Sequence, residues 1–205
     1  MQHGYKFVRQ AMKVLPLSLA NVQGKLQSVA NSYLPYSTGL EIECTIKGDI
    51  SSSVIVLAFN NIPNIMAVDI DYGEQRFRIP NGITGAICLY NICERLKIMS
   101  RLNMTSGIHY HIDCTDITRE KYFRIANLHC RNKQSFILKA LESWGYTGSY
   151  NAWEVSNQKQ AVRFHERYQT IEFRIGEMTF DYELMMKRIL HCQNIVRKLK
   201  ASIKL

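Results

Sequence analysis

Two histidines and an aspartate alternate with apolar residues in segment 107–113, which reads Gly-Ile-His-Tyr-His-Ile-Asp. In an extended strand successive side chains point to opposite faces, so His109, His111 and Asp113 share one face, about 6.5 to 7 Å apart along the strand. Burying such a row is costly unless something binds it, and a metal ion or a phosphate-bearing ligand is the natural candidate. A His-x-His pair by itself is equally compatible with an ordinary solvated strand face.

Two further segments show the same alternation. Glu41 and Glu43 alternate with apolar residues in segment 39–44, and Glu172 and Arg174 do so in segment 170–175. If the three segments share a sheet, their polar faces form one surface of carboxylates, imidazoles and a guanidinium. Because crowded carboxylates repel one another, this surface is expected to bind divalent cations and their anionic ligands.

The elements that position these residues follow from hydrophobic periodicity and turn signals. Strands are expected at 40–47, at the apolar run 54–59, and in a hairpin formed by 65–71 and 74–79. On the return strand of this hairpin Glu74, Arg76 and Arg78 alternate with Gln75, Phe77 and Ile79, so Glu74 is a further candidate for the polar surface. An exposed sheet edge with cross-strand charge pairs explains Glu74 about as well.

Helices are expected over most of residues 1–35 with a break at Pro16, at 83–102, at 118–144, and after Thr179 or Asp181, one of which is the N-cap. Short strands are expected at 150–155 and 160–165. The pattern predicts an α+β fold, with a mostly antiparallel sheet and helices packed on its apolar face. We expect an N-terminal helical extension over residues 1–35 and one domain over residues 36–205.

Composition narrows the class of protein. The 205 residues are 46% hydrophobic, which indicates a folded globular chain. No apolar run approaches the length of about 18 residues that a membrane span needs, and no secretion signal is recognised. The six cysteines show no Cys-x-x-Cys spacing, so free thiols in a reducing, cytoplasmic compartment are expected, in a protein encoded by a cell or by a virus.

The net charge of +9, from 26 Lys and Arg against 17 Asp and Glu, is compatible with nucleic acid, phosphorylated ligands or an acidic partner. No nucleic-acid-binding motif accompanies the charge, so nucleic-acid binding is unsupported. Part of the excess lies on the last helix, where a solvated face explains it.

The three polar strands, in this order, resemble the active-site strands of carboxylate–amine ligases built on the glutamine synthetase fold. The match is closer to the small putative amidoligase family. Its motifs Gly-x-Glu-x-Glu, Gly-Leu-His-Val-His and Thr-Ile-Glu-Phe-Arg, the last followed by Thr-hydrophobic-Asp, correspond here to 39–43, 107–111, 170–174 and 179–181. Glu74 and the segment Asn-Gly-Ile-Thr-Gly at 81–85 are similar to a further family motif. The ordered motifs extend from about residue 39 to 196.

The resemblance implies a glutamine synthetase-like catalytic domain that uses ATP and Mg²⁺ or Mn²⁺. A carboxylate, from a small molecule or a peptide, would become an acyl phosphate, and an amine would then attack it to form an amide. The implied metal ligands are Glu41, Glu43, Glu74, His109 and Glu172. His111 would contact the nucleotide phosphates, and Arg174 would stabilise the transferring phosphoryl group. Arg163 and Arg167 are further phosphate-contact candidates, although a solvated position explains them equally well.

Two other classes compete with the ligase. A metal-dependent hydrolase is suggested by His109-x-His111-x-Asp113, which begins like the metallo-β-lactamase motif, but Cys114 occupies the position of the next histidine. A cupin would not explain Glu41-x-Glu43. A non-catalytic structural or interaction protein that keeps the ligase scaffold, for instance within a larger assembly, fits the basic charge and the N-terminal helices.

Overall fold

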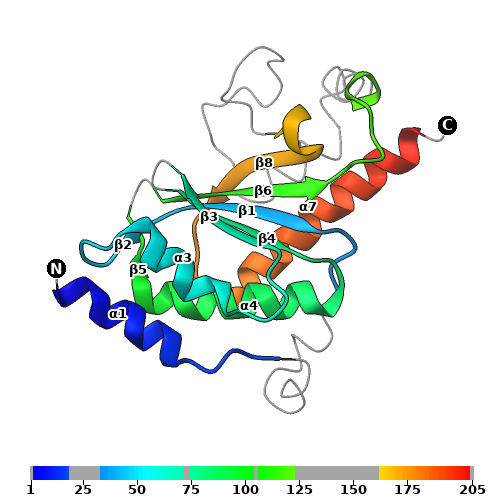
Figure 1. The fold of residues 1–205 in the computed structure, drawn as a ribbon. Coiled ribbons are helices and arrows are strands. Elements are labelled where there is room, and N and C mark those ends of the chain that lie inside the picture. Colours follow the sequence, from blue (N-terminus) through cyan, green and yellow to red (C-terminus); the bar gives the residue numbers. More distant parts are fainter. Residues whose placement is uncertain (1, 19–32, 72–73, 104–105, 123–161, 204–205) are drawn as a thin grey trace.

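Six strands form one sheet in the order β3-β4-β1-β6-β8-β7, and every neighbouring pair is antiparallel (Figure 1). The computed structural model describes residues 2–18, 33–71, 74–103, 106–122 and 162–203. The strands of this sheet are β1 (Thr38–Glu43), β3 (Ala67–Asp71), β4 (Glu74–Ile79), β6 (Gly107–Asp113), β7 (Val162–His165) and β8 (Thr170–Glu177). The expected α+β class with an antiparallel sheet is therefore confirmed.

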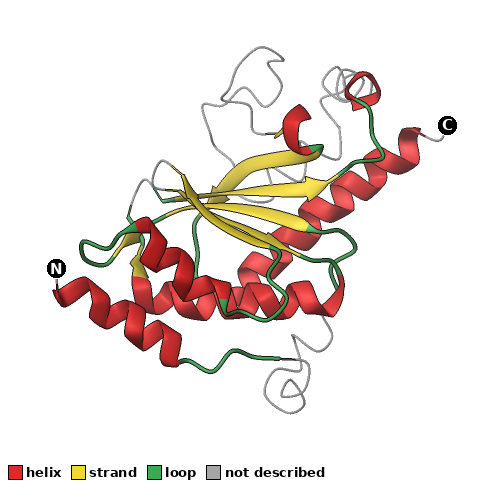
Figure 2. Ribbon diagram, viewed as in Figure 1, coloured by secondary structure: helices red, strands yellow, loops and turns green. Residues whose placement is uncertain are grey.

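The longer helices lie on one side of the sheet (Figure 2). They are α1 (Gln2–Lys13), α3 (Ser52–Asn60), α4 (Gly82–Met99) and α7 (Tyr182–Ile203). A single 3-10 turn, η1 (Glu166–Tyr168), joins β7 to β8, and a second small sheet pairs β2 (Thr45–Ile46) with β5 (Ser100–Arg101). No helix in the described part of the chain is both long and apolar enough to cross a bilayer.

The core lies between the apolar face of the sheet and helices α4 and α7. Leu40, Ile42, Tyr110, Ile112 and Phe173 point into it and are 1% exposed or less. Each fully buried side chain of this size contributes about 1.5–3 kcal/mol of transfer free energy. Because these residues alternate with the charged ones along each strand, packing the helices on one face leaves the charged residues together on the other.

The segment 54–59 is a helix, not the predicted strand. Its three consecutive β-branched residues suggested a strand, but a short apolar run does not distinguish the two structures by periodicity. The buried residues are Ile55, Ala58 and Phe59, at the three- and four-residue spacing of one helix face. The Phe59 ring packs edge-on against Phe77 of β4, with ring centroids 4.9 Å apart, so tertiary packing overrides β propensity here.

The bounds of the other predicted elements differ less from those in the structure. The hairpin is confirmed as β3 and β4, the expected strand 40–47 is divided into β1 and β2, and the helix expected at 83–102 ends at Met99. Residues 119–122 are helical at the expected start of helix 118–144. The rest of that helix and the strand expected at 150–155 lie outside the described residues.

Gly85, in the first turn of α4, allows the helix to start close to the end of β4. A Cβ at this position would lie 1.9 Å from the Pro80 carbonyl oxygen and 2.9 Å from the Leu34 side chain, so only glycine fits. This close approach lets the helix turn back beneath the strand that precedes it.

The N-terminal segment packs on the helical layer. Val8 and Ala11 of α1 are buried, and α1 contacts α3 and α4. The Asn91 side chain of α4 accepts the Leu17 backbone N–H at 2.7 Å and donates to the Leu17 carbonyl at 2.9 Å. The second helical run expected before residue 35 falls largely on residues 19–32, outside the described chain, and the division of the chain at residue 35 stays a prediction.

Candidate metal centre

The antiparallel register aligns the polar residues in rows across the sheet. One row joins β4, β1, β6, β8 and β7 through Arg78, Gly39, His111, Glu172 and Arg163. The adjacent row joins β3, β4, β1 and β6 through Asp69, Arg76, Glu41 and His109. Residues at directly paired positions have side chains close enough to interact, so the pairing itself brings the predicted site together.

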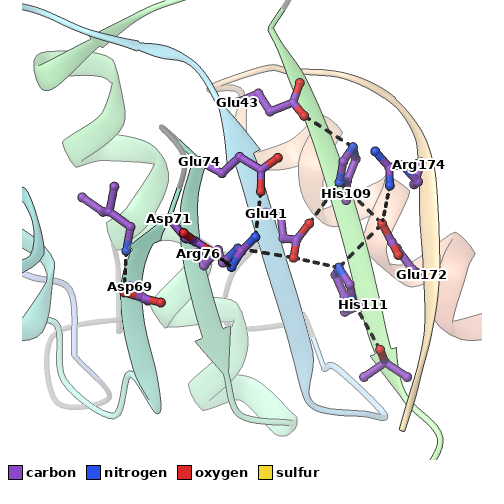
Figure 3. A network of polar contacts seen from close by, with 12 residues as sticks. Glu41, Glu43, Asp69, Asp71, Glu74, Arg76, His109, His111, Glu172 and Arg174 are labelled. Carbon is purple, nitrogen blue, oxygen red and sulfur yellow. Dashed lines mark hydrogen bonds and ion pairs between the residues drawn. The ribbon is translucent and has the colours of Figure 1, made fainter. Parts of the chain in front are cut away.

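The register of β6 and β8 continues from Tyr110–Phe173 to bring Arg174 opposite His109, next to a bulge in β8. Ile108 pairs with Gly176 and Tyr110 with Phe173, so one residue of β6 faces two residues of β8. Such a bulge bends the strand and redirects its side chains. Arg174 lies beside Glu172 and His109 (Figure 3).

Three ligand atoms converge on one point of this surface. The carboxylates of Glu41 and Glu172 and the imidazole of His111 each present an atom, and all three atoms lie within 4.8 Å of one another. Glu41 Oε1 is 3.5 Å and Glu172 Oε1 is 4.0 Å from His111 Nε2. We call Glu41, His111 and Glu172 the metal cluster.

His109 lies beside the metal cluster and links three carboxylates. Its Nδ1 is 3.2 Å from Glu41 Oε2 and 3.6 Å from Glu172 Oε1, and its Nε2 is 3.7 Å from Glu43 Oε1. His109 and Glu43 are thus at the edge of the cluster. The resemblance assigned His109 to the metal and His111 to phosphate, whereas the geometry makes His111 a member of the cluster.

Arginines surround the carboxylates. Glu172 accepts a hydrogen bond from Arg163 Nε, and its Oε1 is 3.5 Å from an Arg174 guanidinium nitrogen. Arg76 contacts Glu41 at 3.5 Å, Glu74 at 3.1 Å and Asp71 at 2.6 Å (Figure 3).

This arrangement corrects one premise of the sequence argument. The carboxylates do not simply repel one another, because guanidinium groups already compensate part of their charge. Glu74 lies outside the metal cluster and pairs with Arg76 of its own strand β4, so this ion pair is not one of the cross-strand charge pairs that were the alternative explanation for it. Its metal role stays a prediction.

The surroundings of Glu41 hold it ionised. Burial by itself raises the pKa of this carboxyl, but contacts with His109 and His111 and the charge of Arg76 outweigh the burial, and the pKa lies well below its ordinary value of 4.5. A carboxylate that stays charged across the physiological range suits cation binding.

Two buried atoms of the cluster have no hydrogen-bond partner in the described structure. They are His111 Nε2 and Glu172 Oε1, and both point at the place where the ligand atoms converge. The other ring nitrogen of His111 lies 3.1 Å from Thr170 Oγ1, which orients the ring. Unsatisfied buried polar atoms are rare and need a reason, and a bound cation supplies one. Two carboxylates with an imidazole form a donor set for a divalent ion such as Mn²⁺ or Mg²⁺.

Two further predicted residues lie outside the cluster. Arg167 is exposed in η1, with its guanidinium 5.5 Å from the centre of the Tyr168 ring. The Asp113 carboxylate accepts the Thr115 backbone N–H at 3.3 Å. Within the described residues, Asp113 is not a member of the metal cluster. The hydrolase alternative required Asp113 as a metal ligand.

The sequence argument missed two aromatic residues beside the cluster. His165 of β7 stacks on Tyr168, with ring centroids 4.5 Å apart, and the His165 ring lies 5.7 Å from that of His111. Burial, followed by the neighbouring His111, lowers the pKa of His165. Its alternation with Arg163 was a usable signal for the same face, but nothing in the sequence placed Tyr168, which lies in a 3-10 turn.

Comparisons with known proteins identify no relative. No family model, no curated protein and no solved structure matches the chain.

Proposed function

We propose that the chain is an ATP-dependent carboxylate–amine ligase that works with a divalent metal ion. One observation carries the proposal: the ligand atoms of Glu41, His111 and Glu172 lie within 4.8 Å of one another, and two of those atoms are buried without a hydrogen bond. The order of the strand motifs supports the choice of ligase among metal-dependent reactions. A glutamine synthetase-like catalytic fold is part of the same proposal.

In this proposal the metal cluster holds the first ion. Glu43 and His109 at its edge, with Glu74, are the candidates for a second ion. A divalent ion at this position would offset the charge on ATP phosphates during phosphoryl transfer. The protein contributes ligands fixed on three adjacent strands, which is a more precise support than loops provide.

The proposed reaction has two steps. A carboxylate oxygen of the substrate attacks the γ-phosphorus of ATP and ADP leaves, which gives an acyl phosphate. An amine nitrogen then attacks the acyl carbon, inorganic phosphate leaves, and the amine gives up a proton as the amide forms.

Arg174 is the proposed donor to the transferring phosphoryl group. Its guanidinium lies 3.5 Å from Glu172, which is longer than a direct hydrogen bond, so its donors remain available to a ligand. Arg163 is bound more closely to Glu172, so we assign it to holding that carboxylate in place.

A non-catalytic scaffold is the second candidate, and one observation favours it. Each carboxylate of the metal cluster already has cationic neighbours: Glu172 has Arg163 and Arg174, and Glu41 has Arg76. A polar network that balances its own charge can stabilise a sheet face without any ion.

Metal titration and ADP release separate the two candidates. The ligase is expected to bind Mn²⁺ in calorimetry and to release ADP from Mg·ATP in the presence of a carboxylate and an amine. Glu41→Gln should abolish both, while Glu183→Gln, an exposed carboxylate on α7, should change neither. A wild-type protein that binds no divalent ion and releases no ADP across a panel of carboxylic acids and amines would establish the scaffold instead.

A further inference from the structure

A pocket of about 230 Å³ lies on the polar face of the sheet, directly beside the metal cluster. Glu41 and His111 belong to both the pocket and the cluster, and Arg78, Asp69 and Asp113 also line the pocket. A ligand in this pocket therefore lies in contact with two of the proposed metal ligands.

The register explains why the sheet is hollow at this place. Arg78, Gly39 and His111 are successive positions of one row across β4, β1 and β6. Gly39 has no side chain, so the space above β1 between Arg78 and His111 stays open. A Cβ on Gly39 would lie 3.1 Å from the His111 Cβ, so even alanine would press on the histidine.

Arg78 differs from the other arginines on this face. Arg76, Arg163 and Arg174 each pair with carboxylates of the site. Arg78 is exposed and, within the described residues, forms no ion pair. Its guanidinium carries a charge that a ligand can neutralise, with a donor pair that matches a carboxylate.

Two carboxylates of the pocket are likewise without a cationic partner in the described chain. Asp69 accepts the Ile70 backbone N–H at 2.8 Å, and Asp113 accepts that of Thr115 at 3.3 Å. The pocket thus offers one unpaired cation and two unpaired anions. The complementary ligand carries both a carboxylate and an ammonium group.

We propose that this pocket binds a free α-amino acid, with its carboxylate on Arg78 and its ammonium group on Asp69 or Asp113. Adjacent strands lie about 4.8 Å apart, so the backbones of β4 and β6 are about 10 Å apart across β1, which suits a ligand of this size once the side chains extend inward. That the amino acid is a substrate rests on the proposed ligase function. The binding of the amino acid does not depend on the ligase function, because the groups proposed to hold it lie outside the metal cluster.

Binding is tested in the absence of metal and ATP. Each common L-amino acid is titrated singly into the protein and followed by ligand-observed NMR, and the best binder is then compared with its decarboxylated amine and its deaminated acid. We expect at least one amino acid to bind, and both analogues to bind at least about tenfold more weakly, the loss expected for one charge-assisted contact.

Arg78→Gln identifies the contact. This variant should bind the amino acid at least about tenfold more weakly, and should bind the decarboxylated amine as well as the wild type does. Arg101→Gln, which removes an exposed charge from β5, is the matched control and should leave every affinity unchanged. Gly39→Ala should weaken amino-acid binding while all charges are kept.

The outcomes separate this inference from the ligase proposal. If no amino acid binds, or if Arg78→Gln binds it as tightly as the wild type, the pocket assignment is wrong. Amino-acid binding through Arg78 together with no ADP release would retain the pocket and overturn the ligase.

Discussion

Glu172 is the most enclosed member of the metal cluster, with none of its side chain exposed. The alternation in segment 170–175 predicted which face it occupies, because one face of a half-buried strand must be apolar. The same alternation placed Arg174 on that face beside Glu172, but it did not predict that Arg163 would bind the carboxylate. Arg163 reaches it through the pairing of β7 with β8, and local periodicity does not encode which strands pair.

The neighbours of Glu172 reverse one expectation about stability. If the carboxylates of the site only repelled one another, removing one charge in Glu172→Gln would leave the protein as stable as the wild type or slightly more stable. With two guanidinium groups against it, we expect this substitution to lower the free energy of unfolding by about 1–3 kcal/mol, because Arg163 and Arg174 lose their counter-charge. Urea denaturation in EDTA measures the difference.

Glu166→Gln is the control for that measurement. Glu166 pairs with Arg119 at 3.2 Å, but the two side chains are 65% and 58% exposed, so the loss should stay below about 1 kcal/mol. If Glu172→Gln is more stable than the wild type, the carboxylates of the site do repel one another and the arginines do not compensate their charge.

We also expect Glu172→Gln to weaken Mn²⁺ binding, and equal affinities of variant and wild type in calorimetry would count against the metal cluster.

Arg174→Lys separates charge compensation from phosphoryl binding. Lysine supplies the same charge but cannot form two parallel hydrogen bonds to a phosphoryl group. The variant should fold and bind nucleotide normally, while ATP-dependent amide formation falls by roughly 10²-fold or more, the loss typical of one transition-state donor. ADP release is measured for both proteins across amino acids and amines, and an unchanged rate would assign Arg174 to charge balance alone.

At the scale of elements, the strands of the site were predictable and one helix was not. β1, β6 and β8 each alternate over five or more residues, which specifies both the strand and its buried face. The segment that forms α3 is apolar almost throughout, and only its position against Phe77 of β4 decides between helix and strand. That position depends on tertiary contacts and has no local signal.

The start of α7 was predicted from Thr179 and Asp181, and the structure assigns the cap to Asp181. Its carboxylate accepts the Leu184 backbone N–H at 3.0 Å, while the Thr179 hydroxyl accepts the N–H of Asp181 itself. Asp181→Ala should therefore destabilise the protein by about 1 kcal/mol, and Asp181→Ser should recover most of that loss. Thermal or urea unfolding of the three proteins tests this, and equal stabilities would show that the cap has no energetic role.

At the scale of the whole molecule, the described cysteines behave as core residues. Cys44, Cys88, Cys93, Cys114 and Cys192 are all free thiols, and only Cys44 is not fully buried. Burial raises the pKa of Cys88 to about 11 and those of Cys93 and Cys114 to about 12, from an ordinary value of 9.0. The neutral thiol is thus favoured in the folded state, and the thiols contribute stability that is lost as pH rises above 9.0.

Alkylation rates test this description. Because the thiolate is the reactive form, iodoacetamide at pH 8 should modify Cys88, Cys93 and Cys114 in the native protein roughly 10²- to 10³-fold more slowly than in urea. Peptide mapping by mass spectrometry distinguishes the sites, with the half-exposed Cys44 as the internal comparison. Rapid native modification of Cys93 would mean that the core between α4 and α7 opens far more readily than its packing implies.

The strand order has a consequence for how the chain is made. Glu41 in β1 meets His111 of β6 and Glu172 of β8, so the two carboxylates of the metal cluster are synthesised 131 residues apart, the difference between positions 172 and 41. At about 5–20 residues per second, the ribosome needs roughly 7 to 26 s to cover that distance. During this interval β1 and, once it is made, its sheet neighbour β4 exist without β8, and the apolar residues that α7 will cover remain open to water and to chaperones. The site is thus assembled late in translation, and a nascent chain arrested just before residue 172 carries two of the three cluster residues, Glu41 and His111, without the second carboxylate.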